Sequence, residues 1–351
     1  MELIVEIVRC FASMATYDPE ADRYDIDGVM GPDEFHDGYP GRPGSGLRNN
    51  AYTNILLAWI AGRAAALLSQ LDRRDDGRTN GRLGLSGEEL ERWDRLTRRL
   101  RVPFHADGVI SQFEGYADLA ELDWSAYRAR YGDIGRLDLI LAAEGDTANR
   151  YRASKQPDVL MLLYLLSAED LRATLDRFDY QLDGAAVRRT VVFYLDRTSH
   201  GSTLSRPVCS WLLARADRAQ SWFLFNEALD SDLADIQRGT TREGTHLGAM
   251  AGTVDLLLRC YTGLETRDGA LWLHPALPLE LRRVRFEICY RGHGISVDLT
   301  PSTLTLHLQP RTAAPIQVHI EDEEVTLHAG HSYTFDLLTP AGTGRPPDTS
   351  L

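Results

Sequence analysis

The spacing of apolar residues changes near residue 270, and this change constrains the fold more than any other feature of the sequence. Before it, apolar side chains recur every three or four residues, which is the spacing of one helix face. These stretches are residues 2–15, 51–71, 160–178, 187–194, 208–215, 221–236 and 246–261. After it, apolar and polar residues alternate, as they do in half-buried antiparallel strands. The alternating stretches are residues 284–288, 295–299, 304–308, 316–320 and 333–337.

The pattern therefore predicts a helical domain followed by a small antiparallel β domain. We place the helical domain at residues 1–268 and the β domain at residues 269–338. A further helix is expected from Ser86 to Leu100, because Ser86 and Glu89 have the spacing of a capping box. Residues 339–351 are rich in Pro, Gly and Thr, which predicts a disordered tail.

Charge and composition exclude several classes of protein. The net charge of -13 argues against nucleic acid as a partner, because binding to a phosphate backbone needs a basic surface. No apolar run approaches the roughly 20 residues of a membrane helix; the longest is residues 159–166, and we expect no membrane association and a cytoplasmic location. The cysteines form no C-x-x-C pair, so we expect free thiols and no metal. They are Cys10, Cys209, Cys260 and Cys289.

One carboxylic acid stands in a turn that fixes its direction. Residues 28–36 read GVMGPDEFH, and they place Glu34 just after the Gly31-Pro32 turn. The neighbouring Asp33 and Asp37 should disfavour the ionised form of Glu34, as like charges do. Glu34 is therefore a candidate general acid.

Four polar clusters precede predicted helices, at residues 49–50, 154–157, 200–205 and 243–246. Helix N-termini offer unpaired N–H groups and a positive dipole end, so several of them together would bind an anion such as phosphate. Each cluster also has an ordinary interpretation. Asn50, Ser205 and Thr245 could simply cap their helices, and His246 could be a partly buried histidine with its hydrogen bonds satisfied.

The order and spelling of these segments resemble glycoside hydrolase family 65, whose best-known members are inverting phosphorylases of maltose, trehalose or kojibiose. The resemblance rests on the acid segment and on NNAYTN at residues 49–54, KQPDV at 155–159, the serine loop at 200–205 and GTHLGAMAG at 244–252. It implies an (α/α)6 toroid followed by a small β domain. The chain resembles only the second half of the family's plan, so we expect an incomplete toroid in a truncated or split protein; a natural shorter relative is the alternative.

The resemblance also implies roles for individual residues. Glu34 would be the general acid, Lys155 and Gln156 would contact the bound glucosyl unit, and Ser202, Thr203 and His246 would hold phosphate. Two other features of the sequence receive no catalytic or binding role. The segment from Gln112 to Tyr116 matches the family, but we favour a structural role for it. Arg48 stands where relatives commonly have Asp, which leaves acceptor specificity open.

Phosphorolysis is favoured over hydrolysis by the composition of the serine loop. An inverting hydrolase needs a second carboxylate as general base, and the resemblance implies that hydrolysing relatives place it in the loop where phosphorylases have serines. In this chain Thr198 to Ser205 contains no Asp or Glu. We therefore expect an α-glucosidic disaccharide and inorganic phosphate as partners, β-glucose 1-phosphate as product, and no cofactor. A separately encoded N-terminal half and a homodimer are further candidate partners. A trehalase-like inverting hydrolase and an inactive carbohydrate-binding fragment are the alternatives.

Overall fold

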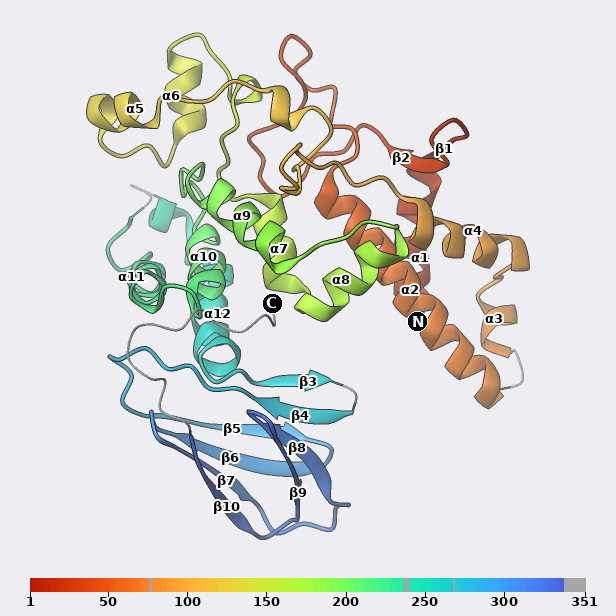
Figure 1. Cartoon of the computed structure of the whole chain (residues 1–351), viewed down its shortest axis with the longest axis vertical. Helices are drawn as coiled ribbons and strands as arrows, with labels where there is room; N and C mark the ends of the chain where they lie inside the picture. The colour runs from red at the N-terminus through yellow and green to blue at the C-terminus, as the bar shows by residue number, and fades with distance from the viewer. Residues whose placement is uncertain (76–77, 237–239, 268, 338–351) are drawn as a thin grey trace. The chain divides into compact units, whose positions relative to one another are not determined.

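The computed structural model describes residues 1–75, 78–236, 240–267 and 269–337. The described residues divide into two compact units, residues 1–205 and residues 206–337 (Figure 1). The expected order of a helical region followed by strands is confirmed, while closure of the helices into an (α/α)6 toroid stays a prediction. The boundary at residue 268 also stays a prediction, and the expected disordered tail lies outside the described residues.

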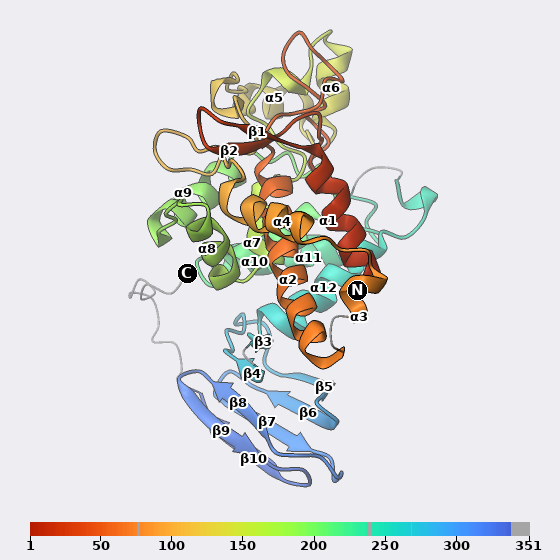
Figure 2. The same ribbon diagram turned by 90° about the vertical axis from the view of Figure 1, so that its right-hand side faces the viewer.

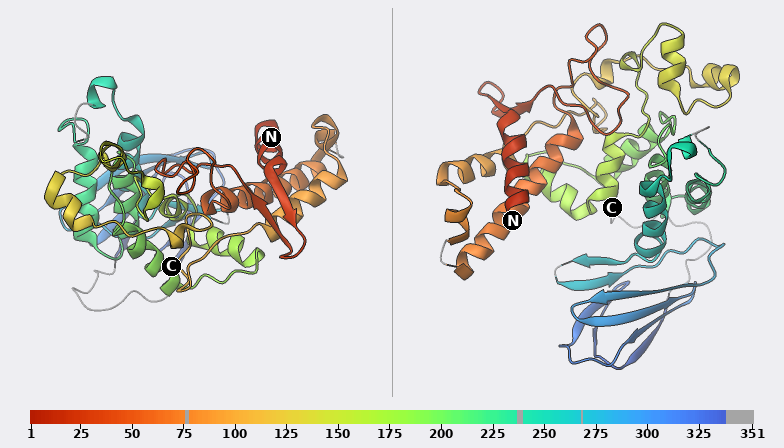
Figure 3. Two further views of the ribbon diagram at one scale, coloured as in Figure 1. Left: turned by 90° about the horizontal axis from the view of Figure 1, so that it is seen from above. Right: turned by 180° about the vertical axis from the view of Figure 1, so that it is seen from behind.

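The first unit is built around one long helix. Helix α2 packs against α1, α4, α7 and α8 (Figure 2 and Figure 3). The helices of this unit are α1 (Glu2–Met14), α2 (Ala51–Asp75), α3 (Arg78–Arg82), α4 (Gly87–Arg99), α5 (Trp124–Tyr131), α6 (Leu137–Ala143), α7 (Asp158–Leu165), α8 (Ala168–Arg177) and α9 (Gly184–Leu195). The capping box before α4 is confirmed in part, since Ser86 accepts a hydrogen bond from the Glu89 backbone N–H.

Two expectations for this unit were wrong. The stretch 160–178 is not one helix, because Leu166 is extended and Ser167 caps a new helix by accepting from the Asp170 N–H. The chain also forms an unexpected hairpin after α1, made of β1 (Ala15–Asp18) and β2 (Arg23–Ile26). The loop that contains Glu34 follows this hairpin directly in the sequence.

Helix α2 corrects the statement that no apolar run approaches membrane-spanning length. By length and composition, residues Ala51–Leu71 could cross a membrane, and 44% of that apolar stretch is buried within the protein. Core helices of globular proteins pass the same test. The contacts of α2 with four neighbouring helices bury part of its apolar surface in the protein core.

The second unit begins with helices and ends with two sheets. Its helices are α10 (Ser205–Leu213), α11 (Arg218–Leu229) and α12 (Leu247–Asp255), the last continuing as a π-helical turn (Leu256–Cys260). The strands are β3 (Glu265–Arg267), β4 (Ala270–Leu273), β5 (Val284–Tyr290), β6 (His293–Leu299), β7 (Thr303–Leu308), β8 (Ile316–Ile320), β9 (Glu323–Leu327) and β10 (Ser332–Asp336).

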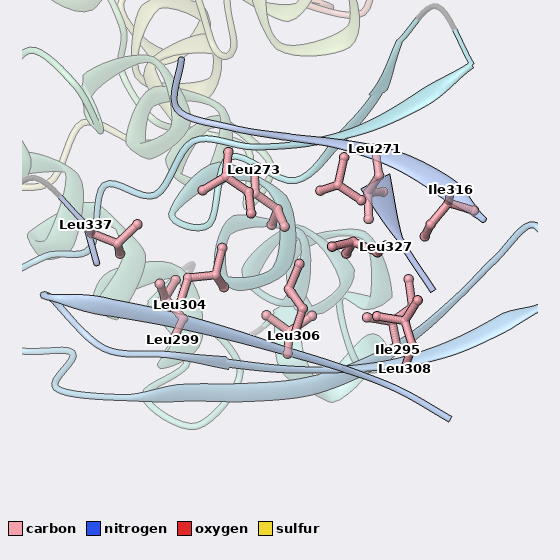
Figure 4. Close-up of a cluster of buried hydrophobic side chains, with 13 residues drawn as sticks. Leu271, Leu273, Ile295, Leu299, Leu304, Leu306, Leu308, Ile316, Leu327 and Leu337 are labelled. Atoms are coloured by element: carbon pink, nitrogen blue, oxygen red, sulfur yellow. The ribbon is translucent and has the colours of Figure 1, made fainter. Parts of the chain in front are cut away.

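The five predicted strands are all present, as β5, β6, β7, β8 and β10. They lie in two four-stranded sheets, ordered β10-β7-β6-β5 and β3-β4-β8-β9. The expectation of a wholly antiparallel domain was wrong at one place, because β4 and β8 pair in parallel with Leu271 opposite Val318. The inward-facing Leu, Ile and Val side chains of both sheets form one apolar core (Figure 4).

Candidate active site

Glu34 lies in the loop between β2 and α2 with an unusual backbone. Its φ is 63°, in the left-handed region that non-glycine residues rarely adopt. The side chain is 58% exposed, and its Oε2 lies 2.6 Å from the Nζ of Lys155. The structure thus brings the candidate acid together with a residue expected to contact the sugar, across 121 positions of sequence.

The ion pair with Lys155 cannot by itself hold Glu34 in this conformation. An exposed ion pair contributes about 0–1 kcal/mol, whereas a residue in a sparsely populated backbone region costs roughly 1–3 kcal/mol. Other contacts must stabilise the loop, and they are made by the residue before Glu34.

Asp33 is buried, with 2% of its surface exposed, and its carboxylate accepts hydrogen bonds from several directions. Oδ1 accepts from the backbone N–H groups of Lys155, at 2.6 Å, and Gln156, at 3.1 Å. Oδ2 accepts from Nε2 of Gln112 at 2.9 Å and lies 3.3 Å from Nδ1 of His36. Asp33 therefore faces the protein interior while the adjacent Glu34 faces outward.

A second buried carboxylate, Asp158 at the start of α7, supports the same loop. Its Oδ1 accepts from the Asp33 N–H and its Oδ2 accepts from Nδ2 of Asn50, both at 2.7 Å. Burial, and then the nearby charge of Asp33, raise the pKa of Asp158 above its ordinary value, although these two hydrogen bonds favour the ionised form. Gly31 fits closely against Asp158, since a Cβ at Gly31 would lie 1.7 Å from its Oδ2.

The helix-capping interpretation holds for one of the three residues to which we applied it. Asn50 caps α2, because its Oδ1 accepts from the Thr53 N–H at 3.0 Å, and it also binds Asp158. Ser205 is instead the first residue of α10, and its hydroxyl donates to the Ser202 carbonyl. The residue before α12 is His246, rather than Thr245, and it makes no side-chain cap.

Gln156 presents a buried acceptor whose partner is missing. Its Nε2 donates to the Pro32 carbonyl at 2.6 Å, which ties it to the acid loop. Its Oε1 is buried and has no hydrogen-bond partner among the residues that the structure describes. A buried acceptor is costly without a donor, so a hydrogen-bond donor from outside the chain would be favourable there.

The serine loop and the residues just before it pack against Ser154 and Lys155 in the first unit. Ser154 and Thr198 form a bridge, in which the Ser154 N–H donates to the Arg197 carbonyl at 2.9 Å. A Cβ at Gly201 would lie 2.2 Å from the Gly135 carbonyl oxygen and 3.0 Å from Cγ of Lys155, so this glycine permits the loop's close approach to both residues. Within the loop, Ser202 accepts from the Leu204 N–H. Thr203 is buried.

His246 lies in the second unit, where its surroundings were not anticipated. Its backbone N–H donates to Oδ2 of Asp232 at 2.9 Å, and its Nδ1 lies 2.5 Å from Oδ1 of the same carboxylate. The hydrogen bond from His246 lowers the pKa of Asp232. Asp232 therefore sets the direction of the imidazole. No feature of the sequence indicated that Asp232 would lie beside His246.

The segment from Gln112 to Tyr116 has both structural and site roles. The rings of Phe113 and Tyr116 are buried against each other, with centroids 5.2 Å apart, as expected for core residues. Glu114 accepts from Nδ2 of Asn49 at 2.7 Å. Gln112, in contrast, is part of the site, because it binds Asp33 and also accepts from the Asp158 N–H.

Two other features bear on what the site could hold. Arg48 donates to Asp25 at 2.6 Å and lies near Asp27 and Glu114, so its charge is balanced within the protein. Among the residues described, no three His, Cys, Asp or Glu side chains gather in a way that could hold a metal ion. All four cysteines are free thiols, two of them buried.

A compositional signal overlooked above would have pointed to this site. Of the 38 lysine and arginine residues in the chain, Lys155 is the only lysine. Arginine and lysine are not interchangeable where a compact ammonium must fit a particular place. The single lysine of the chain thus stands where its compact ammonium lies against the candidate acid.

Comparisons with known proteins agree with the arrangement of these segments. Residues 1–255 match the glycosyl hydrolase family 65 central catalytic domain, and residues 264–327 match the C-terminal domain of that family. An uncharacterized glycosyl hydrolase of Mycobacterium tuberculosis is 50% identical over 331 residues, which are 94% of this chain and 25% of that protein. The trehalose 6-phosphate phosphorylase of Lactococcus lactis is 35% identical over 340 residues, 96% of this chain and 42% of that protein.

A solved structure named "Putative kojibiose phosphorylase from human microbiome" superposes with a TM-score of 0.77 at 19% identity. The superposition covers 97% of this chain and 46% of the other. This likeness establishes a shared fold. The chain spans about a quarter to two fifths of the length of the two curated relatives described above. With its catalytic-domain match over residues 1–255, the chain belongs to glycosyl hydrolase family 65.

Proposed function

We propose that the chain carries the general acid and sugar-binding residues of an inverting glycoside phosphorylase. The substrate would be an α-glucosidic disaccharide, and inorganic phosphate would be the second substrate, with no further cofactor. Relatives named as phosphorylases of trehalose 6-phosphate, kojibiose and 1,2-alpha-glucosylglycerol support this reaction class. The observation that carries the proposal is the exposed Glu34 carboxylate, held beside Lys155 by a buried polar network.

In the proposed reaction, Glu34 acts in its protonated form, rather than as the carboxylate of the ion pair with Lys155, and transfers its proton to the glycosidic oxygen, which leaves as a hydroxyl of the acceptor sugar. A phosphate oxygen forms the new bond to the anomeric carbon from the opposite face, so the product is β-glucose 1-phosphate. Lys155 and Gln156 would hold the glucosyl unit, and the unpartnered Gln156 Oε1 is suited to a sugar hydroxyl. Ser202, Thr203 and His246 would hold the phosphate, with Asp232 directing the His246 ring.

The nucleophile is tested by incubating the full chain with trehalose, trehalose 6-phosphate, kojibiose or maltose, with and without phosphate. Anomer-resolved NMR should show β-glucose 1-phosphate only when phosphate is present. Equal cleavage without phosphate, with free glucose released, would favour the hydrolase alternative. No cleavage of any of these sugars in either condition would favour an inactive carbohydrate-binding fragment.

The acid is tested by Glu34→Gln, which is nearly isosteric in an exposed loop. The variant should fold normally and lose at least about 100-fold in turnover of disaccharides, the lower range for losing a general acid. Glu20→Gln is the matched control, since Glu20 is also exposed and lies in the β1–β2 turn. Near-full activity of Glu34→Gln in a protein with measurable phosphorolysis would remove Glu34 from this role.

A further inference from the structure

We propose that Asp33 is a positioning residue that fixes the candidate acid Glu34 against the sugar-binding residues Lys155 and Gln156. Its meaning for catalysis rests on the function proposed above, whereas its effect on geometry can be tested without turnover. Neither the family comparisons nor the sequence assigns this task to Asp33.

Asp33 and Asp158 join the two segments that carry the site. One oxygen of Asp33 accepts two consecutive N–H groups, those of Lys155 and Gln156. In the opposite direction, the Asp33 N–H donates to the Asp158 carboxylate, and Gln156 reaches back to the Pro32 carbonyl. Each segment therefore binds the other through buried polar groups, and the segment containing Glu34 cannot move independently of the one containing Lys155.

The network requires a carboxylate at position 33. Oδ1 of Asp33 faces the two backbone amides, and Oδ2 faces Nε2 of Gln112 and Nδ1 of His36. An asparagine would turn its own NH2 group either toward the two amides or toward Nε2 of Gln112, and in the second orientation only Nδ1 of His36 could accept from it. Because the site is buried, water cannot repair the mismatch, and the two segments should separate.

The alternative is that Asp33 only stabilises the core, without governing where Glu34 lies. The single lysine makes the two roles distinguishable, since Lys155 carries the only side-chain amine in the chain. A water-soluble carbodiimide takes up the oxygen lost when a carboxylate and an amine condense, leaving an amide. With Oε2 and Nζ at 2.6 Å, Glu34 and Lys155 should form this amide efficiently.

The experiment treats the full chain with carbodiimide and quantifies the peptide that joins residues 34 and 155 by mass spectrometry. The parent protein and Asp37→Asn should form it in similar yield, because Asp37 is exposed in the same loop and accepts from Asn149 instead. Asp33→Asn should reduce the yield at least fivefold while circular dichroism still shows the parent's helix content.

Undiminished cross-linking in a folded Asp33→Asn protein would overturn the proposal. If that variant does not fold, Gln112→Met decides, because it keeps the side-chain length but removes the donor to Oδ2 of Asp33 together with the acceptor of the Asp158 N–H. A folded Gln112→Met should form less of the 34–155 cross-link than the parent, and an unchanged yield would count against the positioning role of Asp33.

Turnover gives a separate readout. In an active protein, Asp33→Asn should slow phosphorolysis of disaccharides more than that of aryl α-glucosides, whose leaving groups need less protonation. An equal slowing of both would mean that Asp33 does not act through the position of Glu34. Absence of turnover in the parent would count against the proposed function. The cross-linking result would stand by itself, because it measures the position of Glu34 without turnover.

Discussion

Replacing Gly31 by alanine should strongly destabilise the first unit, for a steric reason that the structure makes explicit. The added Cβ would lie 1.7 Å from Oδ2 of Asp158 and 2.8 Å from Nδ2 of Asn50, distances at which atoms overlap. Gly31 does not have a positive φ, so its backbone conformation suits alanine and only the overlap opposes the change. The Asp158 carboxylate would have to move.

The cost follows from what Asp158 would lose. It accepts hydrogen bonds from the Asp33 N–H and from Asn50, and a buried donor left without its acceptor costs about 1–3 kcal/mol. Loss of both predicts a destabilisation of about 2–6 kcal/mol, a range that begins within the about 1–3 kcal/mol typical of overpacking a core. For a unit of this size, that lowers the unfolding midpoint by roughly 4–24 °C.

Urea unfolding followed by circular dichroism measures the difference. Gly62→Ala is the matched control, because Gly62 lies inside α2 with nothing within 4 Å of an added Cβ. That change should stabilise the protein by about 0.5–1 kcal/mol, the usual gain for alanine over glycine in a helix. A Gly31→Ala protein within about 1 kcal/mol of the parent would show that the loop and Asp158 are not packed as described.

Three further predictions use the same unfolding assay. Leu306→Ala, in the fully buried core of the sheets, should cost about 2–5 kcal/mol, while Leu279→Ala, 92% exposed, should change stability by less than about 0.5 kcal/mol; equal effects would contradict the assigned core. Ser86→Ala should cost about 1 kcal/mol through loss of the α4 cap, and no loss would mean that the cap contributes nothing. Because the folded protein raises the pKa of Asp158, the contribution of this group to stability should fall as pH rises above about 4, the ordinary carboxyl value; the stability of Asp158→Asn relative to the parent should therefore rise with pH, and a difference that does not change with pH would exclude this contribution.

Local patterns predicted the elements of the fold well, because their causes are local. The alternating stretches became strands, and Ser86 begins a helix where its spacing to Glu89 indicated. The end of one helix and the start of the next at Ser167 could also have been predicted, since a serine followed by acidic residues is a helix-cap signal. The parallel pairing of β4 with β8 could not be predicted from local patterns, because it joins strands that are far apart in the sequence.

The site was predictable only as separate residues. Family resemblance singled out Glu34, Lys155 and Gln156, and the structure brings these three together. Asp33 was expected to act on Glu34 through charge, whereas its carboxylate binds the backbone of Lys155 and Gln156. No periodicity or motif indicates that Asp158 lies beneath this loop, because that contact depends on how α7 packs.

The adjacent residues Asp33 and Glu34 show how one short segment can both anchor a site and present its reactive group. Burial of Asp33 fixes the backbone on one side, and the left-handed conformation at Glu34 turns the next side chain outward. Such strain persists only where surrounding contacts over-determine it. A side chain held this way loses little further freedom when a ligand binds, which is the entropic advantage of a preorganised group. The buried contacts of Asp33 and Asp158 thus fix the backbone that carries an exposed glutamate on a loop, which is what the general-acid role proposed for Glu34 requires.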